Sequence, residues 1–407
     1  MSEPAPTLAV IGGGQLARMM AQPAIALGLP LRLLAEAEGV SAAQVIPDHV
    51  VGDYTDLETL QLVTAGCAAV TFDHEHVPTE HLHALADAGL AVRPGPEALI
   101  HAQDKGLMRA RLAELGVPCP RNAMVKTPQD VEAFGFPCVL KTTRGGYDGK
   151  GVWFVGSIEE AAEPLRVAAE THVGLLAEER VHFRRELAAL VARSPSGQAA
   201  AYPVVASTQK DGICHEVVAP APDLDPALAA EAQLIALQIA GALDVTGILA
   251  VELFETTAGR VLVNELAMRP HNTGHWTQDG AVTSQFENHL RAVMDLPLGS
   301  PDARARWSVM VNILGGPHDP DRPVGRLYDG FPHALARDPH LRVHLYGKDL
   351  RPGRKVGHVN AYGDNLDECL ERARHAAAWF RGDLGDESES TRGAPPPVHP
   401  PKNGGGT

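Results

Sequence analysis

The sequence predicts an α/β and α+β protein with several domains, and three stretches of the chain support this fold class. Near the N-terminus, the apolar run Leu8–Ile11 ends in three consecutive glycines and is followed by a helix-like pattern. Further along, the mostly apolar segment 136–141 leads into a glycine-rich loop at 144–151. Two more apolar segments, 248–255 and 261–266, both contain glutamate and are separated by a short turn. Strands alternating with helices predict a parallel sheet, whereas consecutive strands predict antiparallel pairs.

Length and composition limit the number of domains, the kind of ligand and the cellular compartment that we expect. With 407 residues, the chain is long enough for two to four domains, and 44% hydrophobic with 21% charged residues is globular usage. The net charge of −15 argues against nucleic-acid binding, and no apolar run approaches the length of a membrane span. Five scattered cysteines and the absence of an export signal favour a reducing cytoplasm. We therefore expect a cytoplasmic protein that acts on small molecules.

The order of these patterns divides the chain into six consecutive segments. Strands alternate with helices up to about residue 95, as in a parallel sheet covered by helices. The last segment is dominated by Ser, Glu, Pro and Gly, which is typical of disorder. The expected segments are a Rossmann-like domain (1–95), a helical connector (96–120), a small α+β unit with the glycine loop (121–187), a larger α+β domain (188–300), a small β-rich module (301–384) and a disordered tail (385–407).

The first glycine turn has the pattern Gly12-x-Gly14-x-x-Ala17 between a strand and a helix. One interpretation is a nicotinamide dinucleotide site, in which Glu36, about twenty residues on, would bind the ribose. A second is that the glycines serve only the path of the chain. We favour a third, in which the amides at the start of the helix hold a phosphate or ring of a substrate.

The second glycine loop contains four glycines within residues 145–151 and is bracketed by Lys141 and Lys150. Glycines let backbone N–H groups approach an anion closely, and the two lysines add positive charge. We therefore expect this loop to cover a polyphosphate; the alternative is a surface hairpin between two strands. It is not a P-loop, because no Gly-Lys-Ser/Thr opens a helix.

The two glutamate-bearing strands predict a metal site. A two-residue turn at 258–259 would place Thr257 opposite Arg260. The same register would place Glu252 opposite Glu265, with Cβ atoms about 5 Å apart. Two such carboxylates suit Mg²⁺ bound together with phosphates, whereas in the alternative one acid faces solvent and the other pairs with an arginine. The candidate metal ligands are Glu252, Asn264 and Glu265.

Smaller features fit a nucleotide-dependent enzyme. Segment 175–181 has the pattern of a strand entering a hinge that could surround an adenine, and Glu186 could bind its ribose. The polar loop 269–276 directly follows the second metal carboxylate and is placed to hold an acceptor substrate. Asp73 and Glu75 share one face at the carboxyl end of a predicted parallel strand, where a carboxylate could hydrogen-bond a substrate amine. Four cations within 348–355 indicate a monophosphate clamp, although a solvated basic turn is the alternative.

Together these motifs resemble the ATP-grasp superfamily and, within it, the N5-carboxyaminoimidazole ribonucleotide synthetases of purine biosynthesis. The resemblance covers residues 8 to about 380 and rests on the motifs at 12–16, 145–151, 264–266, 269–275 and 351–358. It implies an ATP-grasp fold with an N-terminal Rossmann-like (pre-ATP-grasp) domain, a central lid domain and a C-terminal ATP-grasp domain ending in a β-rich module. It also implies a homodimer.

The resemblance further implies the ligands and their residues. The ATP contacts it implies are Lys105, Lys141, Gly145, Gly146, Tyr147, Asp148, Gly149, Lys150, Gly151, Glu178, Glu179, Arg180, Val181, Glu186, Asn264 and Glu265. The contacts it implies for aminoimidazole ribonucleotide are Gln15, Leu16, Glu75, Tyr147, Asp148, Arg269, His271, Asn272, Lys348, Arg354 and Lys355. Tyr147, Asp148, Lys348 and Arg354 would take catalytic roles. Mg²⁺ would lie on Glu252, Asn264 and Glu265.

The implied reaction is the ATP- and bicarbonate-dependent carboxylation of the ribonucleotide's amino group. Alternatives are another ATP-grasp ligase, such as a formate-dependent glycinamide ribonucleotide transformylase, an NAD-dependent reductase, and a non-catalytic nucleotide sensor. The sequence departs from the family pattern at several positions: Lys105 stands where an arginine is usual, Asp73 replaces a glutamate, and Met268 replaces a proline. None of these changes removes a group that the chemistry requires.

Overall fold

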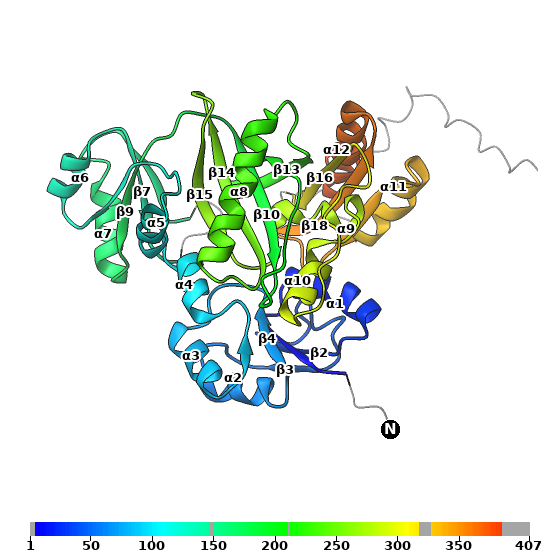
Figure 1. Cartoon of the computed structure of the whole chain (residues 1–407). Coiled ribbons are helices and arrows are strands. Elements are labelled where there is room, and N and C mark those ends of the chain that lie inside the picture. Colours follow the sequence, from blue (N-terminus) through cyan, green and yellow to red (C-terminus); the bar gives the residue numbers. More distant parts are fainter. Residues whose placement is uncertain (1–4, 146–149, 211, 317–326, 385–407) are drawn as a thin grey trace, which may run out of the picture.

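The computed structural model describes residues 5–145, 150–210, 212–316 and 327–384. Figure 1 shows an N-terminal domain at the bottom, a large central sheet above it and a smaller body, the lid, at the left. The fold therefore has the predicted combination of a parallel α/β domain with antiparallel α+β parts. The expected disordered tail, 385–407, lies outside the described residues, as do Gly146, Tyr147, Asp148 and Gly149.

The N-terminal domain contains a parallel five-stranded sheet with the strand order β3-β2-β1-β4-β5. Strands β1, β2 and β4 are apolar and almost entirely buried because the sheet is covered on both faces, as expected for a doubly wound fold. Its strands are β1 (Leu8–Ile11), β2 (Leu31–Ala35), β3 (His49–Val51), β4 (Ala69–Phe72) and β5 (Ala91–Val92), and its helices are α1 (Gln15–Leu27), α2 (Leu57–Thr64) and α3 (Thr79–Asp87).

The connector is a pair of helices, α4 (Pro96–Gln103) and α5 (Lys105–Glu114), as predicted. Asp104 separates them, and its carboxylate accepts hydrogen bonds from the backbone N–H groups of Gly106 and Leu107. This N-cap fixes the start of α5 and so the position of Lys105, its first residue. The backbone of Lys105 also donates to Thr143 O (2.9 Å), which ties α5 to the lid.

The lid is an antiparallel four-stranded sheet with the order β6-β9-β7-β8. Its elements are β6 (Asn122–Val125), α6 (Pro128–Phe134), β7 (Cys138–Thr142), β8 (Val152–Val155), α7 (Ala162–Thr171) and β9 (Leu175–Glu179). The expected boundary at 187/188 is a misplacement, because it falls within β10 (Phe183–Arg193), which pairs with the large sheet along its whole length. The lid sheet ends at Glu179, so the hinge lies between β9 and β10.

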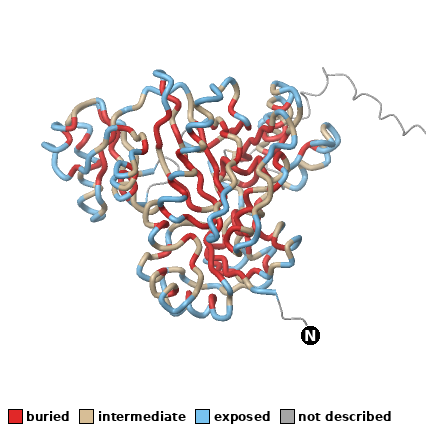
Figure 2. The backbone as a smooth tube through the Cα atoms, in the orientation of Figure 1, coloured by how far each residue is buried: buried red, intermediate tan, exposed pale blue. Residues whose placement is uncertain are grey.

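The large sheet has the order β15-β14-β10-β12-β13-β16-β18-β17, with β11 paired to β10. Its other strands are β11 (Ala199–Ala201), β12 (Val205–Lys210), β13 (Ile213–Ala219), β14 (Gly247–Thr256), β15 (Val261–Ala267), β16 (Trp307–Leu314), β17 (Arg342–Leu345) and β18 (Lys355–Gly363). The strands of the expected small β-rich C-terminal module, β16, β17 and β18, extend the same sheet, because β16 pairs with β13. Figure 2 shows that most residues in the central strands of this sheet are buried, whereas edge strand β17 has no buried residue.

The helices that cover the large sheet pack against it in separate apolar clusters. The buried faces of β10 and β14 pack against α8, whereas β16 and β18 pack against α12 around a separate apolar cluster. Helix α10 packs against α1 and against β14, and so joins the large sheet to the N-terminal domain. These elements are α8 (Pro226–Ala242), η1 (Asn272–Gly274), α9 (Thr277–Gly280), α10 (Gln285–Val293), η2 (Leu327–Gly330), α11 (Phe331–Arg337) and α12 (Leu366–Arg381).

None of the helices in the described part of the chain is long and apolar enough to cross a membrane.

Candidate active site

A cavity of about 2230 Å³ lies where the three bodies meet, between the lid, the large sheet and the carboxyl ends of the N-terminal strands. It is larger than a pocket for one drug-sized ligand and has room for two nucleotides. Among the described residues, every predicted ligand-binding residue except Gly151 lines it: Gln15, Leu16, Glu75, Lys105, Lys141, Gly145, Lys150, Glu178, Glu179, Arg180, Val181, Glu186, Glu252, Asn264, Glu265, Arg269, His271, Asn272, Lys348, Arg354 and Lys355. The predictions for Gly146, Tyr147, Asp148 and Gly149 fall outside the described residues.

The predicted pairing of Glu252 with Glu265 is present, although the turn that was expected to produce it is wrong. The loop has three residues, with Gly259 in a left-handed conformation (φ 71°), and residues 256 and 260 face each other through the hydrogen bond Thr256 N–H to Arg260 O (2.8 Å). The pairing is therefore one residue out of the expected register near the turn. A β-bulge at Asn264 restores the expected register, because β15 has one extra residue there.

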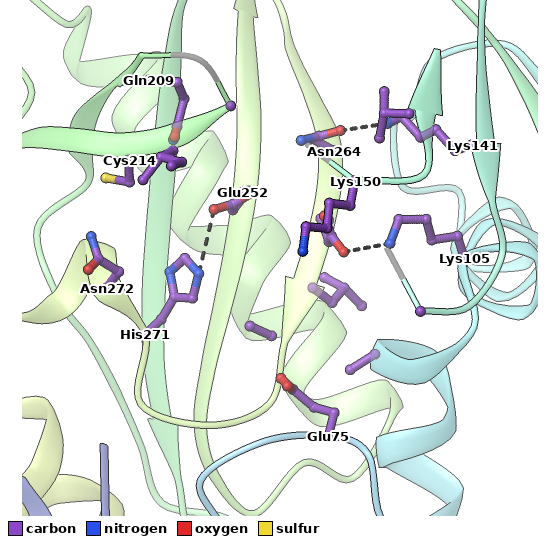
Figure 3. Close-up of a pocket in the computed structure, with 18 of the residues that line it drawn as sticks. Glu75, Lys105, Lys141, Lys150, Gln209, Cys214, Glu252, Asn264, His271 and Asn272 are labelled. Atoms are coloured by element: carbon purple, nitrogen blue, oxygen red, sulfur yellow. Dashed lines mark hydrogen bonds and ion pairs between the residues drawn. The ribbon is translucent and has the colours of Figure 1, made fainter. Parts of the chain in front are cut away.

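This bulge turns three oxygen-bearing side chains into the cavity, and Figure 3 shows Glu252 and Asn264 among the residues that line it. Burial and the neighbouring Glu265 carboxylate raise the pKa of Glu252 to about 7. Two facing carboxylates and an amide oxygen form a hard oxygen donor set, which fits the predicted Mg²⁺. The geometry is thus compatible with the prediction that Glu252, Asn264 and Glu265 bind the metal.

The lysines expected to contact phosphates lie directly beside these ligands (Figure 3). Lys105 Nζ donates to Glu265 Oε1 at 2.8 Å, and Lys141 Nζ donates to Asn264 Oδ1 at 3.1 Å. Lys141 also forms an ion pair with Glu178 (2.6 Å). Because both Glu178 oxygens are engaged by cations, its carboxylate is not free to bind an adenine edge, whereas the backbone of 179–181 still lines the cavity.

At the other end of the cavity, cations of the C-terminal segment face the N-terminal domain. Lys348 Nζ donates to the side-chain oxygen of Gln15, which brings together two residues that are 333 positions apart. Arg269 Nε donates to Glu75 Oε2 at 2.6 Å. Arg354 and Lys355 line the same region, so the residues predicted to hold a ribonucleotide are gathered in one place.

His271 lies between the two ends and is neutral. Burial, together with the charges of Arg269 and Lys355, lowers the pKa of His271 to about 3. Its Nε2 lies 3.5 Å from Glu252 Oε1, so this contact is not an ion pair in spite of the short distance. A neutral imidazole beside Glu252 can hydrogen-bond a small polar group without adding charge.

The first glycine turn is packed by the side chains of its own domain. The Glu36 carboxylate accepts a hydrogen bond from Gly13 N–H (2.9 Å), so it is not the free ribose ligand that a nicotinamide site requires. Asp73 Oδ1 accepts from Ala17 N–H (2.7 Å), and a Cβ at Gly14 would lie 2.0 Å from Asp73 Oδ2. The amide of Ala17 therefore meets a carboxylate of the protein, whereas Gly14, Gln15 and Leu16 line the cavity.

One residue of this region was missed by the sequence analysis. Arg109 of α5 is buried and contacts both Glu178 and the backbone of β15. Its position, four residues after Lys105, places both cations on the same side of α5. This spacing is the feature of the sequence from which Arg109 could have been predicted as part of the site.

Comparison with known protein families covers most of the chain. Residues 5–103 match the ribonucleotide synthetase preATP-grasp domain, and residues 110–286 match the ATP-grasp domain. Residues 308–372 match the phosphoribosylaminoimidazole carboxylase C-terminal domain. The chain is 54% identical over 381 residues to N5-carboxyaminoimidazole ribonucleotide synthase of Mycobacterium tuberculosis, covering 92% of this chain and 88% of that protein.

The chain belongs to the N5-carboxyaminoimidazole ribonucleotide synthase family. Corynebacterium ammoniagenes has a member that is 52% identical and covers 91% of both chains. Among solved structures, an ADP complex of N5-carboxyaminoimidazole ribonucleotide synthetase has a TM-score of 0.83 and 33% identity, covering 94% of this chain and all of that one. The Aspergillus clavatus enzyme in complex with ADP and 5-aminoimidazole ribonucleotide has a TM-score of 0.82 and 30% identity, covering 93% and 99%. The family and the ATP-grasp fold predicted from the sequence are confirmed.

Proposed function

We propose that this protein uses ATP and bicarbonate to carboxylate the amino group of 5-aminoimidazole ribonucleotide, forming N5-carboxyaminoimidazole ribonucleotide, ADP and phosphate. The observation that carries this proposal is one cavity with two differently charged ends. Facing carboxylates and lysines form one end, and the cations of the C-terminal segment face the N-terminal domain at the other. Solved relatives have been captured with ADP and with 5-aminoimidazole ribonucleotide, which fits two separate nucleotide sites. The match of 308–372 to a carboxylase C-terminal domain disfavours a glycinamide ribonucleotide transformylase.

ATP is proposed to bind between the lid and the large sheet, with its phosphates near Lys105 and Lys141. The hinge backbone at 179–181 would surround the adenine, and Glu186 would bind the ribose; burial raises the pKa of Glu186, so it suits a neutral hydroxyl partner. Glu252, Asn264 and Glu265 would hold Mg²⁺, which would neutralise phosphate charge when bound. Gly145 and Lys150 line the cavity, so the loop between β7 and β8 would cover the phosphates.

The ribonucleotide is proposed to bind at the opposite end. Lys348, Arg354 and Lys355 would hold its 5′-phosphate by charge-assisted hydrogen bonds. The aminoimidazole ring would lie toward Gln15, Leu16 and Glu75. Asp148 and Tyr147, outside the described residues, remain predicted to position the amine.

The reaction is proposed to proceed in two balanced steps. A bicarbonate oxygen attacks the γ-phosphorus of ATP and the bond to the β-phosphate oxygen breaks, giving carboxyphosphate and ADP. The exocyclic amine then attacks the carboxyl carbon, or CO₂ released from carboxyphosphate; phosphate leaves and the amine loses one proton. Arg269, His271 and Asn272 line the cavity and would bind the bicarbonate-derived group next to the ribonucleotide, where exclusion of water would protect it from hydrolysis.

The decisive experiment measures ADP release by the purified chain with ATP, Mg²⁺ and bicarbonate, with and without 5-aminoimidazole ribonucleotide. We expect this ribonucleotide, but not glycinamide ribonucleotide with formate, to stimulate ADP release, and the carbamate product to appear in equal amount. Stimulation by glycinamide ribonucleotide and formate instead would establish the transformylase alternative. Binding of ATP without any turnover would establish a nucleotide sensor.

The homodimer implied by the resemblance and the cytoplasmic location expected from the cysteines belong to the same proposal. Sedimentation of the full chain tests the first: a mass of about twice 43.2 kDa is expected. A single-chain mass would exclude the dimer without affecting the proposed chemistry.

A further inference from the structure

A closed ring of buried hydrogen bonds connects helix α5, the lid and the edge strand β15. Arg109 Nε donates to Glu178 Oε1 (2.6 Å), and Glu178 Oε2 pairs with Lys141 Nζ (2.6 Å). Lys141 donates in turn to Asn264 Oδ1 (3.1 Å). Arg109 closes the ring by donating from its second terminal nitrogen to Asn264 O (2.7 Å). Each of the three bodies that this ring joins therefore contributes a charged or polar group to it.

Arg109 also fixes the backbone of the bulge that presents the metal ligands. Strand β15 is the edge of the large sheet, where outward-facing carbonyls have no neighbouring strand. The Arg109 guanidinium donates to two consecutive carbonyls, Val263 O (3.0 Å) and Asn264 O. The fork geometry of arginine makes this double contact possible, whereas a lysine has a single ammonium. The residues held in this way directly precede Glu265.

The charges in the ring explain why an arginine is needed there. The side chains of Arg109 and Glu178 are only 2% and 3% exposed. Burial alone would raise the pKa of Glu178, but Arg109 and Lys141 hold it below its usual range. The ring contains two cations and one carboxylate, so one positive charge is in excess. Because Arg109 neutralises Glu178, the charge of Lys141 remains available for a phosphate.

We propose that Arg109 is a positioning residue for nucleotide binding, which neutralises Glu178 so that Lys141 can engage phosphate and which fixes the Asn264 bulge. Without it, Glu178 would capture Lys141 as its sole counter-ion, and the carbonyls of the bulge would lose their donor. The inference rests on the proposed function only for its nucleotide site, and it does not depend on which acceptor is carboxylated.

The test measures binding of Mg²⁺·ADP by titration calorimetry, with the full-length chain and its variants. We expect R109M to raise the Kd for Mg²⁺·ADP by about 10- to 100-fold, in the range seen when supporting contacts of ligand sites are removed. R109K should lie between R109M and the wild type, because lysine can pair with Glu178 but cannot hold both carbonyls. The KM for the ribonucleotide, whose site is at the other end of the cavity, should stay within about twofold.

The double variant R109M/E178Q separates this role from simple structural support. Removing the carboxylate releases Lys141, so the double variant should bind Mg²⁺·ADP about fivefold more tightly than R109M, a non-additive result. Arg185 provides a matched control, because it also bridges a glutamate, Glu255, and two backbone carbonyls, and all three of these partners lie outside the lid. R185M should lower stability and leave the Kd for Mg²⁺·ADP unchanged.

An unchanged Kd in R109M, a double variant that binds no better than R109M, or an equal loss of affinity in R185M would each overturn the proposal. If R109M does not fold, R109K and R109K/E178Q replace it, with the same ranking expected. Failure of the proposed function would look different: the wild type would bind Mg²⁺·ADP without ribonucleotide-stimulated ADP release.

Discussion

Acidification should weaken the fold through His289, a buried histidine that joins the N-terminal domain to the large sheet. Its Nδ1 accepts a hydrogen bond from Ile248 N–H (3.1 Å), so the ring proton lies on Nε2 and is donated to Thr71 Oγ1 (2.8 Å). Protonation would remove the first bond and leave a buried charge. Burial accordingly lowers the pKa of His289 to about 3.

The size of the effect follows from linkage. Because the pKa is lower in the folded state than in the unfolded state (about 6.5), the stabilisation by neutral His289 is complete above pH 6.5 and is lost as the pH falls. Between pH 7.5 and pH 5, the free energy of unfolding should therefore fall by about 2 kcal/mol through this one group, at about 1.4 kcal/mol per pH unit.

The assay compares urea unfolding of the wild type and H289Q from pH 7.5 to pH 5. Glutamine can accept from Ile248 N–H and donate to Thr71, but it cannot be protonated. Other buried histidines, such as His275, contribute equally in both proteins, so the difference between the two profiles isolates His289. We expect H289Q to be less stable at pH 7.5 and to lose about 2 kcal/mol less on acidification. Parallel pH profiles would refute the reasoning.

Three further predictions test the site and its packing. Lys348→Ala should raise the KM for the ribonucleotide at least about tenfold and leave the KM for ATP nearly unchanged, since it removes a charged contact at one end only; equal effects on both substrates would contradict the assignment. Glu252→Gln should abolish ADP release at any Mg²⁺ concentration, and chelation with EDTA should do the same to the wild type; full activity in EDTA would exclude the metal. Gly274→Ala should cost about 1–3 kcal/mol of unfolding free energy, because its Cβ would lie 2.3 Å from Gln285 Oε1. Gly241→Ala, in helix α8 with open space around it, should instead stabilise by about 0.5–1 kcal/mol, and urea midpoints separate the two.

The fold could be predicted from the sequence where a local hydrophobic pattern lies beside a functional motif. The glycine turn after β1, the helix pair α4–α5 and the strands with embedded glutamates all lie where the periodicity placed them. The pairing of β13 with β16 was not predictable in this way. These strands are separated by almost ninety residues, and no local sequence pattern indicates with which distant strand a given strand pairs. The β-rich module at 301–384 was therefore predicted without its place in the large sheet.

In the candidate site, too, some details of strand register and burial could not be predicted from local sequence. Glu252 was predicted to face Glu265 from a two-residue turn, but the loop has three residues and the Asn264 bulge compensates. A bulge adds one residue to a strand and cannot be recognised from composition. The wrong turn length and the unpredicted bulge therefore cancelled each other, and the predicted pairing of Glu252 with Glu265 was right. Arg109 was missed for another reason: an arginine in an amphipathic helix looks solvent-exposed until its buried partners are known.

The pairing of the ligand-binding groups with each other indicates how the cleft remains folded and also binds strongly charged substrates. Lys105 meets Glu265, Lys141 meets Glu178, and Arg269 meets Glu75, so these charged groups of the cleft are paired within the protein. A magnesium-bound triphosphate would exchange partners at its own end instead of meeting bare charges: Glu265 would turn to the metal, and Lys105 and Lys141 would turn to phosphate. Since each exchange replaces one ion pair by another, the gain per contact is modest, and affinity depends on how many partners change together. Because Arg109 joins the lid, the connector and β15, we expect it to determine whether the exchange occurs as one event.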